Sequence, residues 1–148
     1  MGLPSGQPPS GQTWILLEST LEGVDHGESL VKAALKESGL PEEDQYWVLL
    51  AVREILVNAA YHGNRFDADK KVSLRITRHD AGFAIDIGDE GDGFDPDVVP
   101  DPKMHHNLAK QSGRGLLIAR SFLDEVTISR REPRGMLVHM TKAIKTQV

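Results

Sequence analysis

The ten residues EILVNAAYHG, numbered 54–63, end the longest amphipathic pattern of this 148-residue chain. The pattern begins near Glu42, and its apolar residues recur at helical spacing. These apolar residues are Val48, Val52, Ile55 and Ala59. Gly63 and Asn64 follow the pattern, and such a pair is typical of residues that end a helix. The sequence therefore predicts a helix over Glu42–His62 with one buried face.

A polar row lies beside the apolar stripe of this helix. Glu54, Asn58 and His62 are spaced four residues apart, which places them on one side of a helix. A carboxylate there can orient or deprotonate an attacking hydroxyl, and an amide oxygen one turn later can bind Mg²⁺. A solvated helix face is the alternative interpretation. His62 is nearest to the stripe, so we expect it to pack there or to face the negative end of the helix dipole.

The rest of the chain alternates between strand and helix patterns. The expected strands and helices, in chain order, are a strand Trp14–Leu17, a helix Val24–Ser38, the helix Glu42–His62, strands Val72–Thr77 and Phe83–Gly88 joined as a hairpin, a helix Gly115–Leu123, and strands Glu125–Ser129 and Gly135–Lys142. This order predicts an α+β fold, a two-layer sandwich with a mostly antiparallel mixed sheet and helices on one face. Residues 1–12 are rich in Gly, Pro, Ser and Gln and are expected to form a flexible tail before one domain, 13–148.

An acidic, glycine-containing segment, DEGDGFDP at residues 89–96, directly follows the strand Phe83–Gly88. An Asp at a strand end can accept a hydrogen bond from an exocyclic amine such as that of adenine. Gly91 and Gly93 allow the backbone to approach a flat ring. An acidic turn is the alternative. An EF-hand is excluded because its twelfth position lacks Glu, and a dinucleotide-binding turn is excluded because Pro96 follows rather than a helix.

A second glycine-containing segment, SGRGL at residues 112–116, opens the last predicted helix. Free N–H groups and the positive dipole end of a helix N-terminus suit phosphate oxygens. An ordinary helix start is the alternative, and a P-loop is excluded because its motif is absent. The irregular residues 94–112 between the two segments are expected to form a lid or binding loop.

Composition excludes several classes of protein. The chain has 22 acidic and 17 basic residues, a net charge of −5, and no cluster of Lys or Arg, which argues against nucleic-acid binding. The longest apolar run, Trp47–Val52, has six residues, whereas about 20 are needed to cross a membrane. The absence of Cys excludes disulfides and cysteine nucleophiles. No secretion signal pattern opens the chain, so a cytoplasmic location is expected.

Taken in order, the three motifs resemble the N, G1 and G2 boxes of the ATP-binding domain of the GHKL superfamily. The resemblance runs from about Trp14 to Lys142. Within the superfamily the chain is most similar to the anti-sigma-factor serine/threonine kinases, which phosphorylate small STAS-domain antagonists and bind sigma factors. The resemblance implies a Bergerat fold that holds ATP and Mg²⁺ between the second helix and a lid.

The resemblance also implies roles for individual residues. Glu54 would be the general base toward the acceptor hydroxyl, Asn58 would coordinate magnesium, and Asp89 would bind the adenine amine. The remaining residues expected around the nucleotide are His62, Gly91, Gly93, Phe94, Gly113, Arg114, Gly115 and Leu116. Two positions depart from the family pattern: Met136 follows Gly135 where many members have Thr, and Gln111 stands where some members have Arg.

Three further expectations concern the function as a whole. A non-catalytic binding module, in which nucleotide sets only the partner surface, is the alternative to a kinase. A sensor histidine kinase is not expected, because the 53 residues before Glu54 are assigned to a tail, a strand and a helix. A homodimer is plausible from the resemblance and from an exposed first strand.

Overall fold

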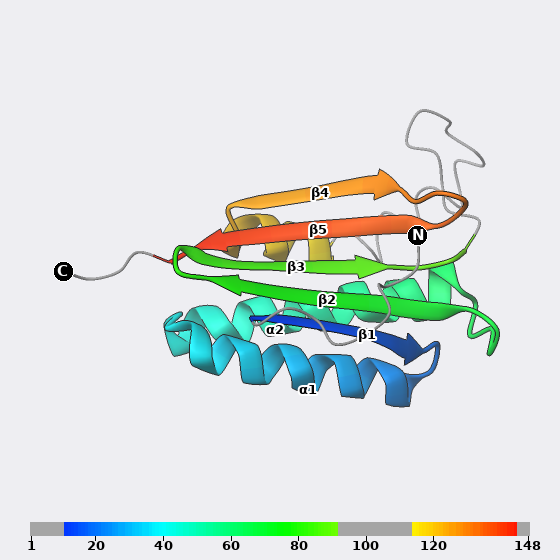
Figure 1. Ribbon diagram of the computed structural model, residues 1–148, viewed down its shortest axis with the longest axis horizontal. Coiled ribbons are helices and arrows are strands. Elements are labelled where there is room, and N and C mark those ends of the chain that lie inside the picture. The colour runs from blue at the N-terminus through cyan, green and yellow to red at the C-terminus, as the bar shows by residue number, and fades with distance from the viewer. Residues whose placement is uncertain (1–10, 92–113, 145–148) are drawn as a thin grey trace.

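The computed structural model describes residues 11–91 and 114–144 (Figure 1). Its strands are β1 (Gln12–Glu18), β2 (Lys71–His79), β3 (Gly82–Gly88), β4 (Glu125–Arg130) and β5 (Met136–Ala143). Its helices are α1 (Leu21–Ser38), α2 (Glu42–Val57), the π-helix η1 (Asn58–Gly63) and a helix over residues 114–122. The predicted element order is confirmed, while residues 94–112, predicted as a lid, lie outside the described ranges, as do Gly93 and Gly113.

The five strands form one sheet in the order β1-β2-β3-β5-β4. All four pairings of the described strands are antiparallel, so the predicted mixed sheet contains no parallel pair there. The reason is topological. The strands β3 and β4 do point the same way, but β5 folds back between them and pairs with both. The α+β class is therefore confirmed with a purely antiparallel described sheet.

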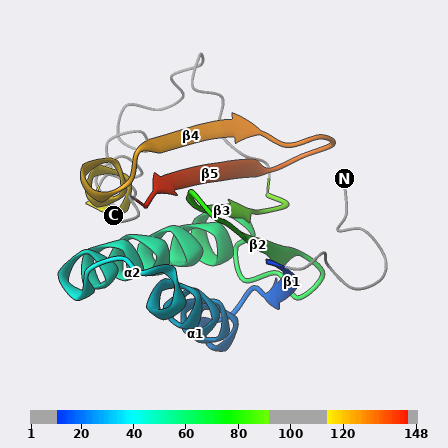
Figure 2. The ribbon, with the colours of Figure 1, turned by 60° about the vertical axis from the view of Figure 1, so that its left-hand side comes forward.

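The helices lie against one face of this sheet (Figure 2). Alternate residues of the strands point toward them, as in Leu74 opposite Ile87 and Ile85 opposite Met140. These side chains are nearly fully buried together with Val52 of α2 and other residues of both layers. Stacked rings of Trp47 and Phe122, 5.7 Å apart, join α2 to helix 114–122. A single hydrophobic core thus fixes the helices relative to the strand ends.

The first helix has clear signals at both ends. Thr20 caps its N-terminus, because the Thr20 Oγ1 accepts a 3.0 Å hydrogen bond from the Gly23 N–H. This cap explains why α1 begins three residues before the predicted Val24. Gly39 ends the helix with a φ of 85°, a left-handed conformation that favours glycine.

The predicted helix Glu42–His62 changes type at Asn58, which corrects the expectation of α-helix throughout. In η1 the Asn64 N–H donates to the Ala59 carbonyl, five residues back, at 2.9 Å. A π-turn holds an extra residue, so the four-residue spacing that placed His62 in line with Glu54 does not apply there. The left-handed residues after the helix are Arg65 and Phe66 rather than Gly63 or Asn64.

Within the described ranges, no helix has the length and apolar character needed to cross a membrane.

Candidate functional site

The end of β3, the start of β5 and the end of η1 meet at one end of the sheet, around Asp89. This residue is 8% exposed. Its N–H donates to the Met136 carbonyl at 3.0 Å. Its Oδ1 accepts from the N–H groups of Gly91 at 3.0 Å and Met136 at 3.2 Å. One carboxylate oxygen of Asp89 is therefore hydrogen-bonded to the backbone of its own loop and of β5.

The second oxygen, Oδ2, faces Gly63 at the end of η1. A Cβ atom added to Gly63 would lie 2.4 Å from this oxygen. Among the described residues, all hydrogen bonds of the Asp89 carboxylate fall on Oδ1. Oδ2 is thus an acceptor that the described part of the chain leaves available, and the absent side chain of Gly63 keeps the space beside it open.

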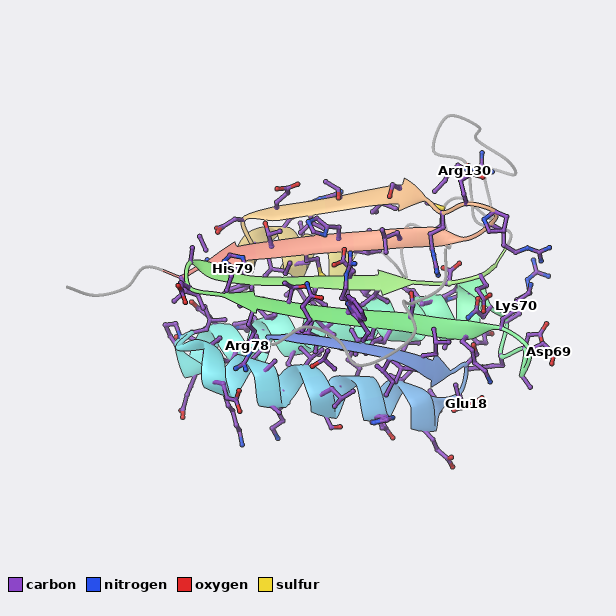
Figure 3. All side chains as sticks on the ribbon, viewed as in Figure 1. Glu18, Asp69, Lys70, Arg78, His79 and Arg130 are labelled. Atoms are coloured by element: carbon purple, nitrogen blue, oxygen red, sulfur yellow. The ribbon has the colours of Figure 1, made fainter. Side chains whose placement is uncertain are left out.

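Burial raises the pKa of Asp89 above its usual range. Hydrogen bonds from the Gly91 and Met136 backbone and the positive charges of Arg131 and Lys70 oppose this rise without cancelling it. Lys70 lies at this end of the sheet, opposite the end that carries His79 (Figure 3). A buried carboxyl group with a perturbed pKa and one available oxygen is typical of a binding or catalytic site.

Glycines allow the segments around Asp89 to approach one another. A Cβ on Gly91 would lie 2.0 Å from the Gly63 carbonyl oxygen, and one on Gly135 would lie 1.9 Å from the Asp89 carbonyl oxygen. Gly135 also has a φ of 102°. The close approach predicted for Gly91 is therefore made by the backbone of Gly63.

Glu54 of α2 lies beside the start of helix 114–122. Its Oε1 is 3.4 Å from Nη2 of Arg114. A Cβ on Gly115 would lie 3.0 Å from the Glu54 Cβ. The Glu54 Oε2 is buried and has no hydrogen-bond partner among residues 11–91 and 114–144. The structure thus brings the carboxylate of the first motif against two residues of the third.

Asn58 stands at the junction of α2 and η1. Its N–H donates to the carbonyls of Glu54 and Ile55, while its half-buried side chain makes no hydrogen bond within the described residues. In those residues no cluster of three or more His, Asp or Glu could hold a metal ion alone. Mg²⁺ commonly takes one or two protein oxygens and completes its shell with water and phosphate, and the free amide of Asn58 fits that demand.

Two other predicted residues have packing contacts. The ring of His62 meets the ring of Tyr61, its neighbour in sequence, edge to face at 4.6 Å, and its expected packing against the apolar stripe stays a prediction. Leu116 packs against the hydrophobic core. Phe94, like Gly93 and Gly113, lies outside the described residues.

Sequence reasoning missed two residues that contact the Asp89 loop. The Arg131 Nη1 donates to the Asp89 carbonyl at 2.9 Å, and the Asn64 Oδ1 accepts from the Glu90 N–H at 2.7 Å. Arg131 lies between the last two predicted strands, and Asn64 belongs to the pair predicted to end a helix. No local pattern marks either residue, because its partner is distant in sequence.

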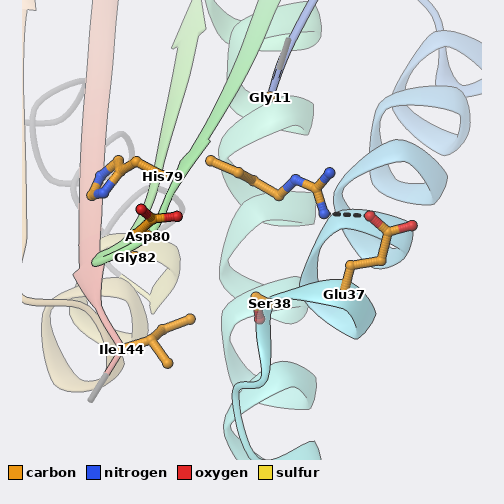
Figure 4. A pocket seen from close by; sticks show the side chains of 8 residues that line it. Gly11, Glu37, Ser38, His79, Asp80, Gly82 and Ile144 are labelled. Carbon is orange, nitrogen blue, oxygen red and sulfur yellow. Dashed lines mark hydrogen bonds and ion pairs between the residues drawn. The ribbon is translucent and has the colours of Figure 1, made fainter. Parts of the chain in front are cut away.

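A separate cavity of about 370 Å³ lies at the opposite end of the sheet (Figure 4). The end of α1 and the β2–β3 hairpin line it, and an ion pair between Arg78 and Glu37 crosses its edge. Its other lining residues include His79 and Ile144. Because β3 runs from this cavity to Asp89, the two places are distinct.

Most of the chain, including Glu54 and Asp89, matches a known protein family. Residues 17–142 match the family described as the histidine kinase-like ATPase domain. The chain belongs to this family. The predicted GHKL resemblance is thereby confirmed, and an ATPase domain of this family implies that ATP is the nucleotide.

Curated relatives of this ATPase domain include proteins named anti-sigma F factor. The chain is 32% identical over 93 residues to those of Bacillus thuringiensis (strain Al Hakam), Bacillus mycoides (strain KBAB4) and Bacillus cereus (strain AH187). The alignments cover 62% of this chain and 64% of each relative. The chain thus spans slightly less than two thirds of the length of these relatives.

Proposed function

We propose that this ATPase domain is a serine/threonine protein kinase and anti-sigma factor. It transfers the γ-phosphoryl group of ATP to a STAS-domain antagonist and sequesters a sigma factor. The anti-sigma F factors to which it is similar support the sigma-factor part. The resemblance to the anti-sigma-factor serine/threonine kinases supports the STAS substrate and a cytoplasmic location.

The observation that carries the kinase proposal is the buried, unpartnered Oε2 of Glu54 beside Gly115. A helix N-terminus offers N–H groups and the positive dipole end to phosphate oxygens. In this proposal the Glu54 carboxylate is a base beside the phosphate site at the start of helix 114–122. From there it can take the proton of an acceptor hydroxyl.

The proposed reaction uses three residues of the chain. Asp89 accepts a hydrogen bond from the adenine amine through Oδ2. Glu54 takes the proton of the acceptor hydroxyl while the oxygen of that hydroxyl bonds to the γ-phosphorus and the bond to ADP breaks. Asn58 offers its amide oxygen to Mg²⁺, which neutralises charge on the phosphates when bound.

A non-catalytic binding module is the second candidate, and the contact between Glu54 and Arg114 favours it. The Arg114 Nη2 lies 3.4 Å from the Glu54 Oε1, so this oxygen faces a guanidinium group of the chain itself rather than an acceptor hydroxyl. The Arg114 side chain is 79% exposed, so it is open to solvent and to a bound partner. In this alternative, nucleotide controls partner binding without phosphoryl transfer.

Glu54→Gln separates the two candidates, with Glu43→Gln as the matched control on the exposed first turn of the same helix. Each protein is incubated with radiolabelled ATP, Mg²⁺ and each small STAS protein from the same genome. We expect Glu54→Gln to lower the transfer rate by about 10² to 10⁴ while ATP affinity stays within a few-fold. Glu43→Gln should transfer at the wild-type rate.

The other results have distinct meanings. Wild-type protein that binds a partner in a nucleotide-dependent way but transfers no phosphate supports the binding module. Glu54→Gln that transfers at the wild-type rate removes Glu54 as the base.

Asn58→Ala should weaken magnesium-dependent ATP binding and transfer together, because a metal ligand acts on the bound ground state as well as on the transition state.

A further inference from the structure

The peptide group between Asp89 and Glu90 is held from both ends by side chains. Its carbonyl oxygen accepts a hydrogen bond from the Arg131 Nη1 at 2.9 Å. Its N–H donates to the Asn64 Oδ1 at 2.7 Å. A peptide group is planar, so it cannot turn without lengthening both of these bonds. The two side chains come from opposite sides of the loop, one from the end of η1 and one from the β4–β5 turn.

The amide of Asn64 is itself fixed. The residue is fully buried, and its Nδ2 donates to the Ser19 Oγ at 2.9 Å and to the Lys71 carbonyl at 3.0 Å. The Ser19 hydroxyl donates in turn to the Lys70 carbonyl at 2.5 Å. Asn64 therefore has its donors bound to the β1–α1 connection and to β2, which leaves Oδ1 aimed at the Glu90 N–H.

The orientation of this peptide group sets the direction of the Asp89 carboxylate. Its Oδ1 is bound by the N–H groups of Gly91 and Met136, and the position of the Gly91 N–H depends on the preceding peptide. If that peptide turned, Oδ1 would lose one of its two donors and Oδ2 would move away from the space beside Gly63.

We propose that Asn64 is a positioning residue for base recognition: together with Arg131 it holds the 89–90 peptide so that the Asp89 Oδ2 faces the exocyclic amine of adenine. The proposal rests on the ATP binding proposed above. Adenine carries a hydrogen-bond donor at the position where guanine carries an acceptor oxygen. A carboxylate oxygen held at this place attracts adenine and repels guanine. The clamp formed by Asn64 and Arg131 on the 89–90 peptide therefore contributes to the choice between the two bases.

The test measures this choice directly. Dissociation constants of ADP and GDP with Mg²⁺ are determined by calorimetry at pH 8 for the wild type, Asn64→Ala, Arg131→Met and Ser19→Ala. The readout is the ratio of the GDP to the ADP constant, which a general loss of stability does not change. We expect Asn64→Ala and Arg131→Met each to lower this ratio by about tenfold, because each frees one end of the peptide.

Ser19→Ala is the matched control. It removes a buried hydroxyl from the same network but leaves the Asn64 Oδ1 on the Glu90 N–H, so its ratio should stay within about twofold of the wild type. A folded Asn64→Ala with the wild-type ratio overturns the proposal. If Asn64→Ala does not fold, the test rests on Arg131→Met in the β4–β5 turn. A wild-type ratio of the GDP to the ADP constant in that variant then overturns the proposal. A wild type that binds neither nucleotide instead refutes the proposed function.

Discussion

At the scale of single residues, the two oxygens of the Asp89 carboxyl group have different surroundings. Its Oδ1 accepts two backbone N–H groups, while Oδ2 has no hydrogen bond within the described chain. We expect Asp89→Asn to keep the fold, because an amide oxygen can accept the same two donors. The amide NH₂ would then meet the adenine amine donor to donor, so ATP affinity should fall at least about tenfold by calorimetry. Unchanged affinity would disprove the adenine contact.

The raised pKa of Asp89 predicts a pH dependence of ATP binding. The Oδ2 accepts the adenine amine in the ionised state, so affinity should fall as the pH drops through a value above the usual 3.8 of this carboxyl group. Calorimetry across this range checks the prediction. Asp89→Asn is the control: proton uptake by the nucleotide phosphates is the same as in the wild type, but the carboxyl group is absent, so the profile should lack this step. Identical wild-type and variant profiles would contradict the assignment.

The same group affects stability with the opposite sign. Because burial raises its pKa in the folded protein, Asp89 binds its proton more tightly there than in the unfolded chain. Its contribution to the free energy of unfolding is therefore present below the unfolded pKa and is lost as the pH rises through the folded pKa. Urea titrations of the nucleotide-free wild type should show this loss, and Asp89→Asn should not.

At the scale of elements, Gly39 at the end of α1 and Gly63 at the end of η1 have different functions. Gly39 has a φ of 85° and no atom within 4 Å of an added Cβ. Gly63 has no strained φ, but its Cβ would lie 2.4 Å from the Asp89 Oδ2. One glycine serves backbone conformation, and the other leaves room for a side chain of the site.

Alanine at each glycine separates these functions. Gly39→Ala should lower the free energy of unfolding by about 1 kcal/mol and leave ATP affinity unchanged. Gly63→Ala should weaken ATP binding by about tenfold or more, because the carboxylate of Asp89 must move. Urea unfolding and calorimetry on both variants provide the measurements. Equal effects of the two substitutions on ATP affinity would refute the distinction.

At the scale of the whole molecule, β1 is an edge strand of the sheet, as the sequence predicted. Its Leu16 is 54% exposed. An open edge with an exposed apolar residue suits pairing with a second copy of the chain, so the homodimer stays a prediction. In a dimer formed at this edge, Leu16→Lys should shift self-association toward monomer in analytical ultracentrifugation. Leu117→Lys, at a leucine of helix 114–122 that is 67% exposed, should not. Equal sedimentation of both variants would exclude this edge.

The sequence by itself determined the element order and the α+β class, and it proposed Glu54 and Asp89 as site residues. Alternation in β2 and β3 and helical spacing around Val52 are local periodicities that follow from strand and helix geometry. Glu54 and Asp89 were predicted because their motifs are short and contiguous. The change from α2 to η1 was not predictable, since α- and π-turns use the same residues and packing selects between them.

The tertiary structure alone decided how the site is held. Glu54 meets Arg114 across 60 residues, and Asn64 meets Ser19 across 45 and Glu90 across 26. Such contacts leave no periodic trace, because their geometry depends on how the helices and strands pack around the core. The available oxygen of Asp89 and the clamp on its peptide therefore emerge only when the separate segments are brought to one end of the sheet.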